Sequence, residues 1–204
     1  MQECHPLQPF LPENATLLML GSFPPPRERW TMNFYYPNFQ NDMWRIMGLI
    51  FFDDKDYFVS GESRSFEEAA IRQFLTTQGI ALYDTAEAVI RQKGNASDLF
   101  LEIVKPIDLK FILSQIPACT TIVTTGQKAT ETLMAILGIP QTPPVGGCTD
   151  AIFMNRTLRC YRMPSSSRAY PKSLTDKANA YRQLFVNIHK ITEQQHINPQ
   201  DIKI

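Results

Sequence analysis

The chain has 204 residues, of which 44% are hydrophobic. This is enough for one domain with a sizeable core, and it excludes a disordered tail protein. The 20 basic and 20 acidic side chains cancel, so any contact with nucleic acid has to come from a local patch of charge.

Membrane and metal-binding classes are not supported by the sequence. No apolar run approaches the ~18 residues needed to cross a bilayer. The first residues include Glu3, His5 and Pro6, where a signal peptide needs a basic start and an apolar stretch. We therefore expect a soluble, cytoplasmic protein. The four cysteines form no C-x-x-C pair, so we expect free thiols and neither a metal nor a cofactor.

The first half of the chain predicts two strands and two helices. Residues 16–21 form an apolar run that ends at a glycine and three prolines, which is typical of a buried strand. Residues 43–50 and 66–76 have apolar side chains at helical intervals, the second with an acidic first turn. Residues 79–84 predict the second strand.

The second half continues the alternation. A helix is predicted at 107–116, a strand rich in β-branched residues at 119–126, and a helix at 128–137 that ends at Gly138. A loop rich in proline and glycine leads to a fourth strand at 157–163 and a final helix at 174–191. This pattern predicts a parallel α/β sheet covered by helices on both faces. We interpret residues 1–204 as a single domain with a polar C-terminal tail from about residue 193.

Ligands of open parallel sheets bind beyond the carboxyl ends of the strands, so the loops there are the candidate site. Residues 126–128 lack the phosphate-loop pattern, and a tight strand-to-helix turn explains them better. The serines at 165–167 fit a loop with a helix cap equally well. The three histidines are near the chain ends or on the last helix, away from these loops, so we do not expect nucleophilic serine chemistry. Trp44, Tyr35 and Tyr36 are also compatible with simple packing.

Charge is segregated near the last strand. Residues 155–177 contain six basic side chains and a single acidic one, in a chain that is neutral overall. A phosphate-contacting face requires segregation of this kind, although a solvated surface also fits it.

Five blocks of sequence resemble the uracil-DNA glycosylase superfamily, and most closely its hypoxanthine-DNA (deoxyinosine) glycosylase branch. They are Gly21-Ser22-Phe23-Pro24, Tyr35-Tyr36 with Asn41-Asp42-Met43-Trp44-Arg45-Ile46-Met47-Gly48, Ile80-Ala81-Leu82-Tyr83-Asp84, Gly126-Gln127-Lys128-Ala129 and Pro164-Ser165-Ser166-Ser167. Each block is weak alone, but they occur in the family's order over nearly the whole chain. The resemblance implies a three-layer α/β/α fold around a central four-stranded, mainly parallel sheet.

The resemblance also implies an activity. A monofunctional DNA glycosylase flips a deaminated base, uracil or hypoxanthine, out of DNA and hydrolyses its N-glycosidic bond, which starts base excision repair. Tyr36 would stack on the base and Asp84 would read its edge. The amides of the Ser22 and Phe23 turn would support the leaving base, and Asn41 would hold the attacking water. DNA would contact the loop after the last strand, with Arg168 or Tyr170 filling the gap left by the base; the residues of this loop are Ser165, Ser166, Ser167, Arg168 and Tyr170. We expect a monomer.

Two positions depart from many relatives. Phe23 replaces a water-orienting Asn or Asp, and Met163 replaces a histidine that supports the leaving anion. The loss of one such donor can cost ~3 kcal/mol of transition-state stabilisation. Two alternatives follow: a DNA-lesion-binding protein that kept the fold but is catalytically weak or inactive, and a small-molecule hydrolase or nucleoside-handling enzyme on the same scaffold.

Overall fold

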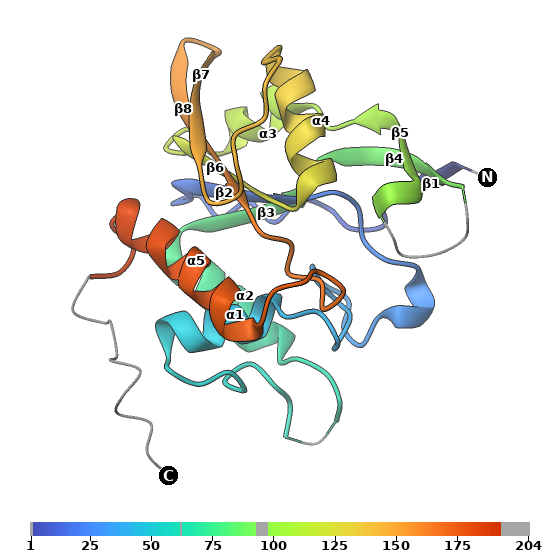
Figure 1. Ribbon diagram of the computed structural model, residues 1–204, viewed down its shortest axis with the longest axis vertical. Coiled ribbons are helices and arrows are strands. Elements are labelled where there is room, and N and C mark those ends of the chain that lie inside the picture. The colour runs from blue at the N-terminus through green and yellow to red at the C-terminus, as the bar shows by residue number, and fades with distance from the viewer. Residues whose placement is uncertain (1, 62, 93–97, 193–204) are drawn as a thin grey trace.

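The computed structural model describes residues 2–61, 63–92 and 98–192, which form eight strands and five α-helices (Figure 1). The strands are β1 (Gln2–Cys4), β2 (Leu17–Gly21), β3 (Ile80–Asp84), β4 (Ala86–Arg91), β5 (Leu101–Pro106), β6 (Thr121–Thr125), β7 (Cys148–Phe153) and β8 (Arg156–Met163). The α-helices are α1 (Met43–Phe51), α2 (Glu68–Gln78), α3 (Leu109–Gln115), α4 (Gln127–Leu137) and α5 (Leu174–Asn187). The tail expected from residue 193 lies outside the described residues.

The central sheet has the strand order β3-β2-β6-β8-β7. The first four strands are parallel, as the alternation of strands and helices predicted. Every residue of β2 and β3 is buried, because helices cover both faces of a parallel sheet and leave no polar side. The register pairs Gly21 with Asp84 and Thr125 with Met163, so the parallel strands end at one level.

The expected four-stranded sheet gains a fifth strand at its edge. β7 runs antiparallel to β8 and pairs with it from Cys148 to Phe153. Met154 and Asn155 both have positive φ, 54° and 58°, which is the geometry of the two-residue turns that join hairpin strands. The sequence did not predict β7, because an edge strand with several exposed residues lacks the apolar run of a central strand.

The helices form the two outer layers. Figure 1 shows α1, α2 and α5 on one face of the central sheet and α3 and α4 on the other. Their bounds agree with the prediction to within a few residues, except that the helix expected to reach residue 191 ends at Asn187. There His189 adopts a positive φ of 57°, and the N–H groups of Lys190 and Ile191 turn back to the carbonyl of Phe185.

A second, three-stranded sheet with the order β1-β4-β5 was not predicted. It is antiparallel, and a small apolar cluster of Phe23, Ala86, Val89 and Leu101 lies beneath it. Because β4 follows β3 after a single residue, this sheet brings the start of the chain to the carboxyl end of β3. In the part of the chain that the structure describes, no helix combines the length and apolar character that a bilayer crossing requires.

Candidate functional site

A pocket of about 760 Å³ opens at the carboxyl ends of the parallel strands. Each of the four parallel strands contributes residues at its carboxyl end or just after it. They are Ser22 after β2, Asp84 at the end of β3, Thr125 and Gly126 at and after the end of β6, and Ser165 after β8. The volume is within the range of small-molecule and nucleotide sites. The long segment after β2 closes the remaining side, so residues far apart in sequence meet here.

The structure brings together nearly all the residues that the sequence singled out. Arg168 is the exception, since it does not border the pocket. The other predicted residues all line it: Ser22, Phe23, Tyr36, Asn41, Asp84, Ser165, Ser166, Ser167 and Tyr170.

Gly21 allows the close approach of Asp84 to the end of β2. A Cβ at Gly21 would lie 2.3 Å from Oδ1 of Asp84 and 3.7 Å from the hydroxyl of Tyr36. Real Cβ atoms do not come this near to a carboxylate oxygen. The missing side chain of Gly21 therefore lets the Asp84 carboxylate and the Tyr36 hydroxyl share one corner of the pocket.

Tyr36 is held in a strained conformation. Its φ is +50°, a region that non-glycine residues rarely occupy and that is often found at functional sites. The hydroxyl forms a 3.1 Å hydrogen bond with Thr125 Oγ1, and the ring meets Trp44 edge to face at 5.9 Å. Burial, assisted by the Asp84 carboxylate, raises the pKa of Tyr36 well above its ordinary value, so the hydroxyl stays neutral.

Asn41 is half-buried just before α1, where its side chain forms a hydrogen bond with the helix backbone. Its Oδ1 accepts a 2.9 Å hydrogen bond from the backbone N–H of Met43, which ties down one of the free donors in the first turn of the helix. The amide group therefore has a fixed orientation at the pocket wall.

Asp98 is a pocket residue that the sequence analysis missed. The Ser22 hydroxyl donates to its Oδ2 at 2.8 Å. Desolvation raises the pKa of Asp98 above its ordinary value, and the Ser22 hydrogen bond opposes this shift. Asp98 starts a short 3-10 helix (Asp98–Phe100), and no motif or periodicity marks it in the sequence. Only the tertiary fold places it beside the turn after β2.

Phe23 and Met163 behave as apolar residues here. The Phe23 ring packs in the small cluster with Ala86, Val89 and Leu101 while also bordering the pocket. Met163 is 1% exposed and belongs to the main core. Neither side chain supplies a hydrogen-bonding group to the pocket.

The expectation that the histidines lie away from these loops is wrong for His5. Its Nε2 lies 2.9 Å from Oδ2 of Asp84. Position near the chain end misled the prediction, because β1 folds back against β4 and carries His5 to the end of β3. His196 lies outside the described residues.

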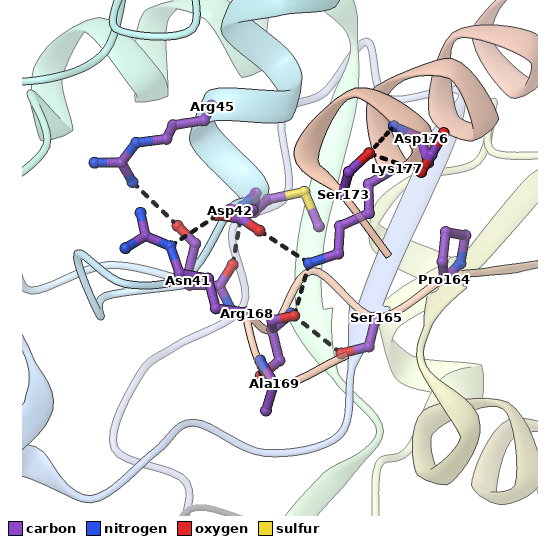
Figure 2. A network of polar contacts seen from close by, with 12 residues as sticks. Asn41, Asp42, Arg45, Pro164, Ser165, Arg168, Ala169, Ser173, Asp176 and Lys177 are labelled. Carbon is purple, nitrogen blue, oxygen red and sulfur yellow. Dashed lines mark hydrogen bonds and ion pairs between the residues drawn. The ribbon is translucent and has the colours of Figure 1, made fainter. Parts of the chain in front are cut away.

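A buried ion pair joins the start of α1 to the loop after β8. Figure 2 shows Lys177 of α5 reaching Asp42, with Nζ 2.9 Å from Oδ2. The same ammonium donates to the carbonyl of Ser167 at 2.7 Å, and the N–H of Asp42 donates to the carbonyl of Ser166 at 2.9 Å. Arg168 completes the network at 3.2 Å from Oδ1 of Asp42. Two walls of the pocket, those with Asn41 and the serines, are thus locked together.

The basic window 155–177 does not form a single face, which corrects the interpretation of its charge. Arg156 starts β8 at the end away from the pocket, about 23 Å from it for a strand of this length, and donates to the carbonyls of Ile116 and Cys119. Arg159 pairs with Asp150, and Lys177 is fully buried. The cations that border the pocket are instead Arg29 and Lys128.

Among the described residues, no group of three or more His, Cys, Asp or Glu side chains is arranged to hold a metal ion. Cys119 and Cys160 are buried, and burial raises the pKa of each thiol, to about 11 and about 12. These two cysteines are therefore core residues in the protonated form.

No family model matches the chain, and no curated protein does. Among solved structures, the chain is similar to the solution NMR structure of a protein described as a putative uracil DNA glycosylase from Methanosarcina acetivorans. The TM-score is 0.59 at 22% sequence identity, and the match covers 93% of this chain and 99% of the other. At this identity the similarity shows a shared fold, in agreement with the expected three-layer architecture.

Proposed function

We propose that the protein is a monofunctional DNA glycosylase that flips a deaminated base out of DNA and hydrolyses its N-glycosidic bond. The observation that carries this proposal is that an aromatic ring, an amide and a carboxylate line one pocket. They belong to Tyr36, Asn41 and Asp84, of which the first and last are 48 positions apart in the sequence. The shared fold with a protein described as a uracil DNA glycosylase supports it.

Each part of the pocket matches a need of the reaction. An everted base loses its stacking in the duplex, and the Tyr36 ring offers a replacement surface. Asp84 accepts a hydrogen bond from a ring N–H, which uracil and hypoxanthine both have. During cleavage the electron pair of the C–N bond moves to the base, so the backbone amides of the Ser22 and Phe23 turn would stabilise the developing anion. The Asn41 amide would position the water that attacks the sugar carbon.

DNA would lie across the loop after β8. The serines and Tyr170 border the pocket mouth, and the exposed Lys172 follows on the same loop. We propose that Tyr170 fills the space left by the everted base, with Arg168 able to contact phosphate by exchanging its partly exposed ion pair with Asp42.

Base release from labelled duplexes tests the proposal. Duplexes with uracil, hypoxanthine or xanthine are incubated with the protein and then treated with alkali, which breaks the strand where a base has left. We expect cleavage of at least one lesion, and none on any substrate would refute the proposal. Borohydride should trap no covalent adduct on Lys128, the lysine that borders the pocket.

Asn41→Ala and Asn41→Asp separate catalysis from folding. Alanine removes both the amide and the helix-capping oxygen, at a cost of about 1 kcal/mol in stability. Aspartate keeps an oxygen for the Met43 N–H but lacks the amide N–H groups. If Asn41 holds the water through its amide, both variants should lose base release and still bind lesion DNA. Full activity of Asn41→Asp would remove the amide from the mechanism.

A catalytically inactive lesion-binding protein is the second candidate, and the apolar environment of Phe23 and Met163 favours it. It would bind lesion-containing DNA in a salt-dependent manner without releasing any base in the same assay.

A further inference from the structure

The start of the chain carries His5 into the wall behind Asp84. β1 pairs with β4, and the N–H of His5 donates to the carbonyl of Glu87 at 2.8 Å. Farther along, Phe10 exchanges two backbone hydrogen bonds with Leu82 of β3, at 3.0 and 2.9 Å. The segment is therefore fixed on both sides of His5.

The imidazole of His5 is almost completely enclosed, with 2% of its side chain exposed. The rings of Phe23 and Tyr83 lie 5.3 and 4.7 Å away between centroids. In this apolar setting its Nε2 lies 2.9 Å from Oδ2 of Asp84. A hydrogen bond that buries a carboxylate oxygen against a ring nitrogen requires a proton between them.

The other ring nitrogen has a partner in either protonation state. Nδ1 of His5 lies 2.9 Å from the carbonyl of Leu7 and 3.2 Å from the N–H of the same residue. A neutral ring can accept from the N–H, and a doubly protonated ring can donate to the carbonyl. In both states Nε2 keeps its proton and donates to Asp84.

This arrangement leaves Asp84 with one oxygen for a ligand. Oδ2 is occupied by His5, whereas Oδ1 lies against Gly21 at the pocket and accepts no hydrogen bond from any described residue. A carboxyl group with two free oxygens could become protonated and pair with both the amine and the ring nitrogen of adenine or cytosine. Asp84 cannot do so while His5 donates to Oδ2.

We infer that His5 is a positioning residue that determines base specificity: it holds Asp84 as a single ionised acceptor, so the pocket takes bases with a ring N–H and rejects adenine and cytosine. The inference rests on the proposed glycosylase function and deepens it. Uracil, hypoxanthine and xanthine present a ring N–H to Oδ1. The ring nitrogens of adenine and cytosine that take the same position carry a lone pair, which the carboxylate repels.

Other titratable groups lie near Asp84, and the test has to distinguish their effect on base release from that of Asp84. Burial raises the pKa of Tyr83 to about 12 and raises those of Tyr35 and Tyr36 further, so none of the three ionises in the assay range. Asp98 is the other carboxyl group in the pocket. The charged groups one layer farther out are Arg72, Glu87, Arg91 and Lys128. The pH profiles are therefore measured both with Asp98 and in an Asp98→Asn background.

The test compares His5→Leu with His5→Gln in single-turnover base release across a pH series. Glutamine keeps an N–H that can reach Asp84, whereas leucine fills the space without a donor. In His5→Leu we expect the preference for hypoxanthine over adenine, and for uracil over cytosine, to fall at least about tenfold. His5→Gln should keep the selectivity of the parent, as should Cys4→Ser, an exposed neighbour on β1.

The outcomes distinguish the two proposals. If His5→Leu releases lesions with the selectivity of the parent, the role of His5 is refuted and the glycosylase function stands. If the parent releases no base at all, both fail. A measurement on the unaltered protein does not depend on how the variants fold: nitrogen chemical shifts of labelled histidine should show Nε2 protonated at the assay pH. An unprotonated Nε2 would overturn the inference.

Discussion

Removing either member of the Asp42–Lys177 pair should destabilise the protein, but by unequal amounts. The Lys177 side chain is 0% exposed, and its ammonium has two partners, the Asp42 carboxylate and the Ser167 carbonyl. Asp42→Asn leaves this ammonium buried without a counter-charge, which typically costs about 3–5 kcal/mol. The change also removes a negative charge from the start of α1, where the helix dipole favours it.

Lys177→Met should cost less, about 2 kcal/mol, which is the scale of a hydrogen bond to a charged group. In this variant the Asp42 carboxylate keeps Arg168 at 3.2 Å, and because the Arg168 side chain is 52% exposed, water also reaches this pair. Methionine fills most of the volume of the lysine stem. The double variant should be more stable than Asp42→Asn alone, because it removes the uncompensated charge.

Urea unfolding at pH 7, followed by the fluorescence of the buried Trp44, measures these differences. Lys172→Met, an exposed change on the same loop, is the matched control and should stay within about 0.5 kcal/mol of the parent. The buried ammonium without its counter-charge should destabilise the protein more than the carboxylate without the ammonium. Equal losses of unfolding free energy in the two single variants, or a larger loss in Lys177→Met, would refute this reasoning.

Two further predictions concern the pocket. Gly21→Ala should lower base release by about a hundredfold, because its Cβ would displace Asp84 Oδ1 from a position 2.3 Å away; Gly61→Ala, where a Cβ meets nothing within 4 Å, is the control, and equal activity of the two would contradict the prediction. The raised pKa of Asp98 means that the folded protein holds this proton more tightly than the unfolded chain. Its contribution to stability is therefore present below the ordinary pKa of about 4 and is lost as the pH rises through the raised value. Relative to the parent, Asp98→Asn should become more stable in urea unfolding as the pH rises from about 4 to neutral, and a difference that is constant with pH would exclude this linkage.

Local sequence signals predicted the frame of the molecule. The apolar runs of β2 and β3 and the β-branched run of β6 are strand signals that need no knowledge of distant residues. Helical spacing likewise predicted α1, α2 and α3, because side-chain periodicity is a property of a few consecutive turns, and a run of helix-forming residues that ends at Gly138 predicted α4. Once four strands are parallel, their carboxyl ends share one edge, so the meeting of Tyr36, Asn41 and Asp84 at one pocket could also be predicted.

The tertiary structure alone decided how these groups are held. His5 meets Asp84 across 79 positions, Ser22 meets Asp98 across 76, and Lys177 meets Asp42 across 135. None of these contacts leaves a periodic trace, since each depends on strand register, on a chain that folds back, or on one helix lying over another. The edge strand β7 and the sheet around β4 belong to the same class, because their few buried positions become apolar contacts only when a neighbour is present. The sequence by itself therefore determined which elements form and where a pocket opens, while the long-range packing decided which ionisable groups face one another inside it.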